Sequence, residues 1–258
     1  MRFQSKNIFI TGASRGIGLA IAKTFAKEGA NVLMTARSEE KLRDEADSIT
    51  REGGNAWFRT MDVADDESVI NATRLALKEF GQIHVLINNA AVAHQEYFLR
   101  SEPSIARMEM ETNYFGLLRV LRAILPSMVD KGEGSLVVVS SVTGKVPYPT
   151  QSTYSASKAA IIAFSEALRG EVKPYGIKVL IVLPGVTDTE MAKNIIVDGP
   201  PPQKPEEVAK MVLEAVVSGK TEIVTSIPSR IFLTLKFLAP NLIDKIVVAS
   251  SKRFGRTQ

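Results

Sequence analysis

Two side chains suited to proton transfer stand four residues apart, at the ends of the stretch Tyr154-Ser155-Ala156-Ser157-Lys158. In a helix, Tyr154 and Lys158 would share one face, because residues at this spacing are neighbours on the helix surface. A tyrosine has an ordinary pKa of about 10, which is too high for efficient acid–base work at neutral pH. A nearby ammonium group stabilises the phenolate and lowers that pKa. The pair therefore predicts a proton-transfer site that needs no metal ion.

A serine is the next candidate for the same site. Ser141 lies thirteen residues before Tyr154, directly after the apolar run 134–140. In open α/β sheets, ligands bind in the crevice at the carboxyl ends of the strands, and this places Ser141 at that crevice. The neighbouring Ser140 is expected to point the other way, because side chains alternate along a strand.

A glycine-rich turn, Thr11-Gly12-Ala13-Ser14-Arg15-Gly16-Ile17-Gly18, follows the apolar run 8–10. Glycines allow a tight turn and a close approach of the backbone to a phosphate, and the helix that follows supplies free N–H groups and a partial positive charge. Between a strand and a helix, such a turn predicts a site for a nucleotide pyrophosphate, although the glycines alone would also suit a plain loop. We expect the contacts from Gly12, Ser14, Arg15, Gly16, Ile17 and Gly18.

Strands and helices alternate along the chain and must position these groups. We expect strands at 8–10, 31–36, 55–61, 83–88, 134–140, 177–183 and 221–225, and helices near 17–27, 39–52, 65–80, 104–130, 153–173 and 205–218. Strands such as Leu136–Val139 are apolar on both faces, which is typical of a parallel sheet covered by helices on both sides. The pattern predicts a doubly wound α/β (Rossmann) fold with a mostly parallel sheet of about seven strands. We expect a single catalytic domain over 1–228 and a C-terminal helical extension over 229–258.

The spacing T-G-x-x-x-G-x-G resembles that of the short-chain dehydrogenase/reductase family, and the resemblance runs from about residue 5 to 225. It implies that Ser141 polarises a substrate carbonyl, that Tyr154 is the general acid and base, and that Lys158 holds the nicotinamide ribose. It also implies that Asn113 positions a water that relays protons to Lys158. On its own, Asn113 would suit a local hydrogen bond within a helix.

The end of the second expected strand favours NADP(H). An NAD-specific site usually has an acidic residue there for the ribose 2′-hydroxyl, whereas this chain has Ala36 followed by Arg37. Arg37 and Arg15 together suit a 2′-phosphate, which guanidinium groups bind through charge-assisted hydrogen bonds; the alternative is two solvated surface arginines. The resemblance adds further cofactor contacts at Asp62, Val63, Asn89, Ala90, Ala91, Tyr154, Lys158, Pro184, Gly185, Val186 and Thr189. The motif around Asn88 and Asn89 ends in Ala91 where the family has glycine, and its asparagines also suit ordinary turn chemistry.

Composition excludes several other classes of protein. The 258 residues contain no cysteine and two histidines, which excludes a disulfide framework and a cysteine or histidine-rich metal site, so we expect no metal. No apolar run approaches the roughly 20 residues that span a bilayer, and the N-terminus lacks the apolar core of a signal peptide. The body shows no basic face for nucleic acid. We expect a cytoplasmic protein.

Three segments are expected to wall the substrate pocket: 91–100, 142–152 and 186–204. Their side chains are largely apolar, which favours a medium-sized hydrophobic ketone, aldehyde or alcohol; they are Val92, Val142, Val146, Pro147, Tyr148, Met191, Ile195 and Ile196. His94 suits either a substrate contact or an ordinary loop position.

The tail 229–258 contains six Lys or Arg residues and one acid, and it resembles the tails of the hydroxysteroid dehydrogenase-like branch. Its apolar residues Leu242, Ile243, Ile246 and Val247 would lie on one helix face. That face could contact a membrane surface, or it could pack over the substrate pocket or at a subunit interface. Family members commonly form homodimers or homotetramers.

Three functions remain open from the sequence. The first is NADP(H)-dependent interconversion of a carbonyl compound and an alcohol. The second is reduction of a 3-oxoacyl thioester. The third, from a different class, is a non-catalytic NADP(H)-binding scaffold or regulator; such proteins often lose the tyrosine or the lysine, which this chain keeps.

Overall fold

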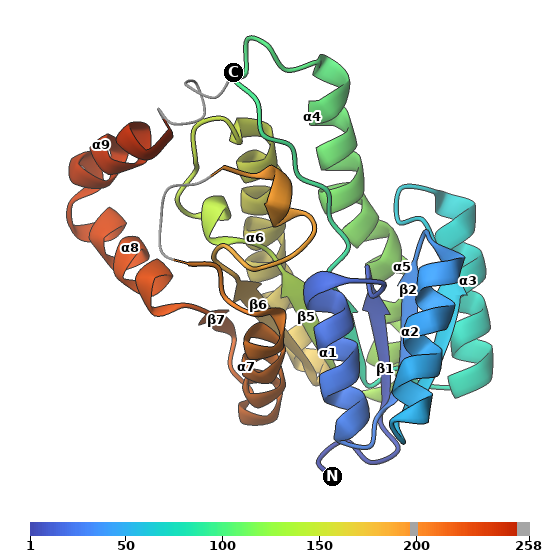
Figure 1. The fold of residues 1–258 in the computed structure, drawn as a ribbon. Helices are drawn as coiled ribbons and strands as arrows, with labels where there is room; N and C mark the ends of the chain where they lie inside the picture. Colours follow the sequence, from blue (N-terminus) through green and yellow to red (C-terminus); the bar gives the residue numbers. More distant parts are fainter. Residues whose placement is uncertain (197–200, 252–258) are drawn as a thin grey trace.

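A single parallel sheet organises the chain. The structure is a computed structural model that describes residues 1–196 and 201–251. Its seven strands run in the order β3-β2-β1-β4-β5-β6-β7, and every pairing is parallel (Figure 1). The strands are β1 (Asn7–Thr11), β2 (Asn31–Ala36), β3 (Asn55–Thr60), β4 (Val85–Asn88), β5 (Gly134–Val139), β6 (Ile177–Leu183) and β7 (Glu222–Val224). The expected doubly wound α/β sheet is confirmed.

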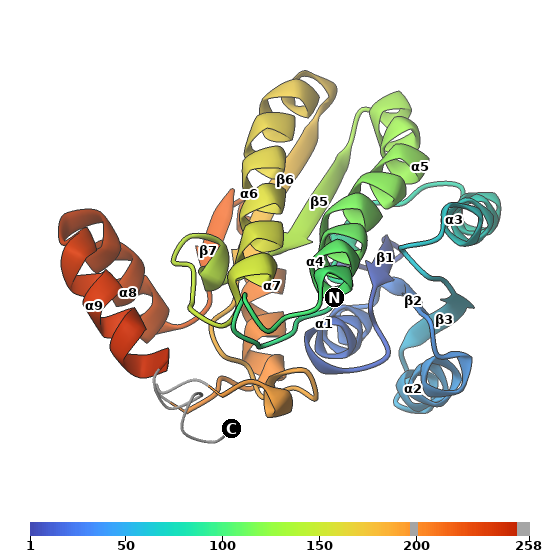
Figure 2. The ribbon, with the colours of Figure 1, turned by 90° about the horizontal axis from the view of Figure 1, so that it is seen from above.

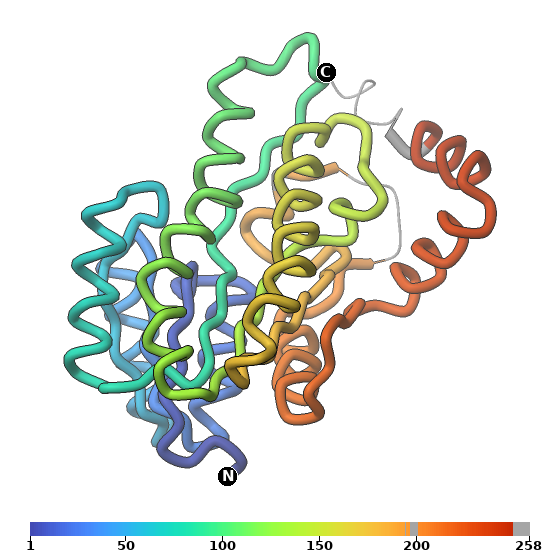
Figure 3. The backbone as a smooth tube through the Cα atoms, turned by 180° about the vertical axis from the view of Figure 1, so that it is seen from behind, coloured from blue at the N-terminus to red at the C-terminus, as the bar shows by residue number. Residues whose placement is uncertain are grey.

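Helices cover both faces of this sheet, as the view from above in Figure 2 shows. One face carries α1 (Gly16–Lys27), α2 (Glu39–Arg51) and α7 (Pro205–Ser218). The other carries α3 (Asp66–Phe80), α5 (Gly116–Lys131) and α6 (Ser152–Val172), which lie in front in Figure 3. Each face contains its own apolar core, and strand β5 contributes to both. Val137 and Val139 point into the core under α1 and α7, whereas Leu136 and Val138 point into the core under α5 and α6.

The helix expected over 104–130 is interrupted. The structure has α4 (Pro103–Met110), then a π-helical turn (Glu111–Phe115), and only then α5. A π turn widens the helix by one residue and is frequent at functional sites. Asn113 lies inside it and is 1% exposed, with its side chain turned toward the loop after β4 and toward α6. Apolar periodicity does not register a single widened turn, so this turn could not be predicted.

The tail forms two helices, α8 (Ile227–Leu238) and α9 (Pro240–Ser251), beyond the β7 edge of the sheet (Figures 1 and 3). The expected apolar face of α9 is divided: Ile243 and Val247 are buried against Val146 and Tyr148, whereas Leu242 and Ile246 are 50% and 42% exposed. Of the two expected placements of this face, packing on the rest of the chain thus applies to Ile243 and Val247. The basic residues Lys252, Arg253 and Arg256 lie outside the described residues.

Short 3-10 turns complete the described chain, at Val142–Gly144, Lys173–Tyr175 and Ala192–Asn194. Within the described residues, no helix combines the length and the apolar character needed to cross a membrane.

Two glycines with the same backbone conformation differ in how closely other backbone atoms approach them. Gly176 (φ 75°) and Gly219 (φ 66°) are both left-handed. A Cβ at Gly176 would lie 2.2 Å from the carbonyl oxygen of Gly132 at the end of α5, whereas a Cβ at Gly219 would have no atom within 4 Å among the described residues. We expect Gly219→Ala to cost about 1 kcal/mol of unfolding free energy, which is the left-handed penalty alone. Gly176→Ala should cost about 3 kcal/mol, because backbone must also shift. Denaturant unfolding of the two variants would measure the difference; equal losses would contradict the close approach.

Candidate active site

A cavity of about 790 Å³ opens at the carboxyl ends of the strands. It runs from the glycine-rich turn after β1, past the ends of β4 and β5, to the segment after β6 and to α8 and α9. The sheet order reverses between β1 and β4, and this is where open α/β sheets bind their ligands. Most of the expected nucleotide-binding and catalytic residues therefore face one continuous space; Gly18 and Asn113 do not line it.

The glycine-rich turn is held by the end of β4. The Thr11 hydroxyl accepts the backbone N–H groups of Asn89 and Ala90, each at 3.0 Å. In return, the Asn89 side-chain amide donates to the carbonyl oxygens of Thr11 (3.1 Å) and Gly12 (3.0 Å). Asn89 thus has a structural task, as turn chemistry suggested, and it also lines the cavity.

The turn can fold tightly and pack against the residues after β4 because two of its residues lack side chains. A Cβ at Gly18 would lie 2.3 Å from the Gly12 carbonyl oxygen, and a Cβ at Gly12 would lie 2.8 Å from the Cα of Ala90. Gly12 and Gly16 also have φ values of 66° and 58°, which other residues rarely adopt. The helix α1 begins at Gly16, so its free N–H groups face the cavity. A turn of this shape, next to a large cavity, fits the pyrophosphate of a nicotinamide dinucleotide.

Two arginines line the corner of the cavity between this turn and the end of β2. Arg37 is exposed, and Lys41 adds a third cation on the same wall. Arg15, by contrast, forms an ion pair with Glu190, and this pair lowers the pKa of the Glu190 carboxyl. A phosphate at this corner would therefore compete with Glu190 for Arg15. Arg37 forms no ion pair with a carboxylate of residues 1–196 or 201–251.

Most of the other expected cofactor residues border the same cavity; they are Ser14, Ile17, Asp62, Val63, Ala90, Ala91, Pro184, Gly185, Val186 and Thr189. Gly18 does not border it and instead packs beneath the turn. Asp62 accepts the backbone N–H of Ala64, which shapes the loop after β3. Val63 packs against Gly116: a Cβ added at Gly116 would lie 2.8 Å from a methyl group of Val63.

Tyr154 and Lys158 lie together on the first turns of α6, and the Lys158 Nζ is 5.7 Å from the centre of the Tyr154 ring. Ser141 reaches them from the end of β5 and forms a hydrogen bond with Tyr154. The Ser141 hydroxyl also accepts hydrogen bonds from the backbone and side chain of Thr143, at 3.1 and 2.9 Å. Ser140 instead donates to the Lys158 carbonyl oxygen at 2.9 Å, in agreement with the expected alternation.

Burial dominates the electrostatics of this pair. It raises the pKa of Tyr154 to about 12, and the hydrogen bond with Ser141 only partly opposes it. It also lowers the pKa of Lys158 to about 8. The chain by itself thus raises the pKa of Tyr154, whereas the nearby ammonium was expected to lower it. The reason is that desolvation disfavours both the phenolate of Tyr154 and the ammonium of Lys158.

Asn113 ties two elements together. Its Oδ1 accepts the Val92 backbone N–H at 2.8 Å, and its Nδ2 donates to the Val92 carbonyl oxygen (3.0 Å) and the Ser157 hydroxyl (2.9 Å). It therefore fixes the loop after β4 against α6, one residue before Lys158.

The expected substrate wall is largely present. Val92, Val142, Val146, Tyr148, Met191 and Ile195 line the cavity, but Pro147 and Ile196 do not, because Pro147 is exposed and Ile196 hydrogen-bonds outward to Gln95. His94 is a loop residue outside the cavity wall. Residues 197–200 of this expected wall lie outside the described residues.

The tail contributes to this region, and packing over the substrate pocket was one of its expected placements. Ser229, Phe232, Ile246 and Val247 line the far end of the cavity. Sequence reasoning missed one other residue. Glu109, one helical turn before Asn113, is fully buried close to Tyr154. The spacing of Glu109 and Asn113 on one helix face was the available signal. Within the described residues, no cluster of side chains suits a metal ion.

Comparison with known proteins gives consistent matches. The model of the short chain dehydrogenase family matches residues 6–198. Dehydrogenase/reductase SDR family member 7B of Xenopus laevis is 35% identical over 97% of this chain and 83% of its own length. The 3-oxoacyl-[acyl-carrier-protein] reductase of Escherichia coli is 35% identical over 76% of this chain and 79% of its own.

Solved structures agree with these matches. A short chain dehydrogenase from Burkholderia cenocepacia in complex with NADP has a TM-score of 0.84 and is 30% identical, with 96% of this chain and 99% of that chain covered. A Burkholderia phymatum relative in complex with NAD also has a TM-score of 0.84, with 94% of this chain and 96% of that chain covered, but at 22% identity it supports the fold alone.

The buried Lys158 gives a stability prediction. Its pKa of about 8 against an ordinary 10.5 means that holding the ammonium costs about 3 kcal/mol at neutral pH. We expect Lys158→Met to raise the unfolding free energy by about 2 kcal/mol there, after loss of the Nζ hydrogen bond to the Val139 carbonyl oxygen. The advantage should shrink as pH rises from about 8 towards 10.5, because the wild-type amine then folds without its proton.

Denaturant unfolding across that pH range would measure this effect. The matched control is Lys210→Met, which removes an exposed lysine from α7 and should show no such trend. A Lys158→Met protein that is less stable than the wild type at neutral pH, by an amount independent of pH, would contradict the costly burial of the charge.

Proposed function

The chain belongs to the short-chain dehydrogenase/reductase family, and we propose that it is an NADP(H)-dependent enzyme that interconverts a hydrophobic carbonyl compound and its alcohol. The observation that carries the proposal is the convergence of Ser141, Tyr154 and Lys158 on one cavity that also contains the glycine-rich turn. A binding scaffold has no need of a buried tyrosine and lysine side by side, since burial of an ammonium is costly.

When bound, the nicotinamide would supply or accept the hydride. Ser141 would donate a hydrogen bond to the substrate oxygen and polarise the carbonyl. Tyr154 would give the proton to that oxygen in reduction and remove it in alcohol oxidation. Lys158 would hold the ribose hydroxyls, and its ammonium would favour the phenolate when oxidation requires it. Asn113 would hold the loop and α6 in register so that a water can reach Lys158.

The preference for NADP(H) rests on Arg37. The last residue of β2 is Ala36, where an NAD-specific site usually has an acidic residue. Arg37 and Lys41 give this corner of the cavity a positive charge that suits a 2′-phosphate. The NADP complex of the Burkholderia cenocepacia relative supports the same assignment.

The apolar wall of the cavity favours a medium-sized hydrophobic substrate. Val142, Val146, Phe232 and Val247 face the space beyond Ser141. Among the described residues that line this end, none is a cation that could bind a carboxylate or phosphate. Similarity to the Escherichia coli 3-oxoacyl-[acyl-carrier-protein] reductase keeps an acyl thioester as the alternative substrate. Activity on a thioester but not on simple ketones would favour that alternative.

Replacing Tyr154 tests the catalytic proposal. We expect Tyr154→Phe to lower carbonyl reduction by about 10²–10⁴-fold, which is the usual contribution of a general acid. NADPH binding should change by less than about threefold, a difference below 1 kcal/mol. The rates would be followed as NADPH consumption with a panel of hydrophobic ketones and 3-oxoacyl thioesters.

The matched control is Tyr175→Phe, which removes a hydroxyl from an exposed tyrosine at the end of α6 and should leave the rate unchanged. A wild-type protein that binds NADPH but reduces none of the panel would favour the scaffold. Retention of full activity by Tyr154→Phe would exclude the proposed mechanism.

Titration of the two reduced cofactors tests the NADP(H) assignment. We expect NADPH to bind at least about tenfold more tightly than NADH, equivalent to about 1.4 kcal/mol. Arg37→Asp should abolish or reverse that preference, because it exchanges a cation for an anion at the expected 2′-phosphate. Arg51→Asp makes the same change at the far, exposed end of α2 and should keep the preference. Equal binding of both cofactors by the wild type would overturn the assignment and leave the catalytic proposal standing.

A further inference from the structure

Two polar side chains on one helix face make the same kind of connection, one turn apart. Asn113 joins Val92 of the loop after β4 to Ser157 of α6. Glu109 joins His94, two residues further along the same loop, to Thr153 of α6. Ser157 and Thr153 are themselves four residues apart, so the two connections form parallel rungs between the same three elements. Tyr154 lies between them on α6.

The second rung is made by a carboxylate. Glu109 is 0% exposed, its Oε1 accepts the His94 backbone N–H at 2.9 Å, and its Oε2 accepts the Thr153 hydroxyl at 2.5 Å. Short hydrogen bonds to a carboxylate are charge-assisted and stronger than neutral ones. A neutral glutamine could join the same partners, because one of its side-chain atoms accepts and the other donates to a hydroxyl. Support of the loop therefore does not require the charge.

The charge acts on the reacting tyrosine. Among the described residues, the ionisable groups that face Tyr154 are Lys158, with its Nζ 5.7 Å from the ring centre, and Glu109, whose carboxylate raises the pKa of Tyr154. The ionisable group that faces Glu109 from the loop is His94, with its Nδ1 3.9 Å from Oε1 and its side chain 44% exposed. A buried anion beside a phenol disfavours the phenolate, since like charges repel strongly where water is excluded.

We propose that Glu109 is a positioning residue for the reaction, which through Thr153 fixes the first turn of α6 and whose negative charge adds to burial in disfavouring the Tyr154 phenolate. This inference rests on the proposed function of Tyr154 as general acid. The consequence is directional: at neutral pH the site holds the proton that carbonyl reduction needs, and alcohol oxidation requires a higher pH. Asn113, the neutral rung, supplies position without this bias.

The test separates charge from position. In the full-length enzyme, Glu109→Gln keeps both hydrogen-bond partners and removes the charge. We expect the midpoint of the pH profile for alcohol oxidation to move down by about half a unit to one unit, a typical effect of one nearby charge. Thr153→Val keeps the charge and removes the hydroxyl; we expect the oxidation rate to fall by about tenfold with no downward movement of the midpoint. Thr153→Ser, which restores the hydroxyl, should restore the rate.

Two controls guard against trivial explanations. Glu166→Gln removes a carboxylate from the exposed side of α6 and should leave the midpoint unchanged. His94→Asn removes the facing imidazole, and a downward shift in Glu109→Gln that persists in the His94→Asn background assigns the effect to Glu109 itself. Thermal unfolding of each variant would show whether it is folded.

A readout without turnover completes the test. Titration of tyrosinate by ultraviolet absorbance, with the Tyr154→Phe spectrum subtracted, reports Tyr154 alone over the pH range in which the protein stays folded. We expect ionisation at lower pH in Glu109→Gln than in the wild type. An unchanged midpoint in both readouts, or the same shift in Glu166→Gln, would overturn the inference. Full activity of Tyr154→Phe would instead refute the proposed function, while the absorbance titration would still decide the role of Glu109.

Discussion

A hydrogen-bonded clasp between the ends of β1 and β4 fixes the point at which the two halves of the sheet diverge. The Thr11 hydroxyl accepts hydrogen bonds from the backbone of Asn89 and Ala90, and the Asn89 side-chain amide donates to the backbone of Thr11 and Gly12. These bonds pair backbone N–H and C=O groups at the ends of the two strands, beyond the last hydrogen bonds between the strands. Left unpaired, such buried groups would lower the stability of the fold. The glycine-rich turn keeps its shape because Asn89 binds the Gly12 carbonyl oxygen from below, so the nucleotide-binding wall of the cavity depends on this clasp.

The catalytic wall is built on a second attachment, between the end of β5 and α6. Lys158 donates to the Val139 carbonyl oxygen at 3.2 Å, and Ser140 donates to the Lys158 carbonyl oxygen at 2.9 Å. This exchange fixes α6 against the sheet at the position where Ser141 meets Tyr154. It also places an ammonium group in surroundings that disfavour its charge, so the site is held at the expense of stability. Enzymes commonly accept such a loss where a reactive group must be pre-organised.

The sequence allowed prediction of what depends on local pattern. The strands, the doubly wound parallel sheet and the glycine-rich turn follow from apolar runs and fixed spacings, and the fold built from them is confirmed. Features that depend on distant partners were not predictable. The pairing of Arg15 with Glu190 joins two segments that no local pattern relates, and the π turn around Asn113 leaves no trace in the apolar periodicity. The direction of the Tyr154 pKa shift was not predictable either, because it depends on how deeply the folded chain buries the side chain.

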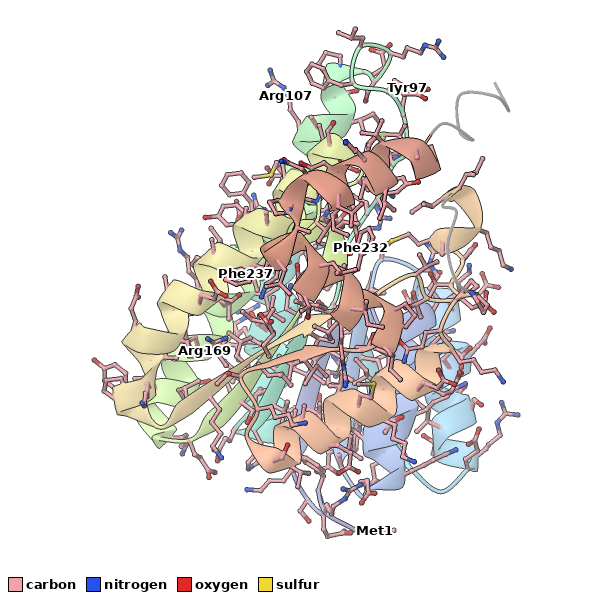
Figure 4. The ribbon with its side chains drawn as sticks, turned by 90° about the vertical axis from the view of Figure 1, so that its left-hand side faces the viewer. Met1, Tyr97, Arg107, Arg169, Phe232 and Phe237 are labelled. Carbon is pink, nitrogen blue, oxygen red and sulfur yellow. The ribbon has the colours of Figure 1, made fainter. Side chains whose placement is uncertain are left out.

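The division of the tail between buried and exposed residues also depends on distant contacts. Ile243 and Val247 pack on Val146 and Tyr148 of the loop after β5. Ser229 of α8 lies close to Gly185, since a Cβ added at Gly185 would be 2.6 Å from the Ser229 hydroxyl oxygen. Two phenylalanines of α8, both labelled in Figure 4, differ in the same way. Phe232 lines the cavity, whereas Phe237 is 87% exposed.

These contacts make the tail part of the cavity, although the match to the family model ends at residue 198. The apolar wall of the cavity is therefore built from two parts of the chain. Val142, Val146 and Met191 come from the matched region, whereas Phe232, Ile246 and Val247 come from α8 and α9. A change in the tail would alter the far end of the cavity and leave the glycine-rich turn and the neighbouring Tyr154 and Lys158 in place.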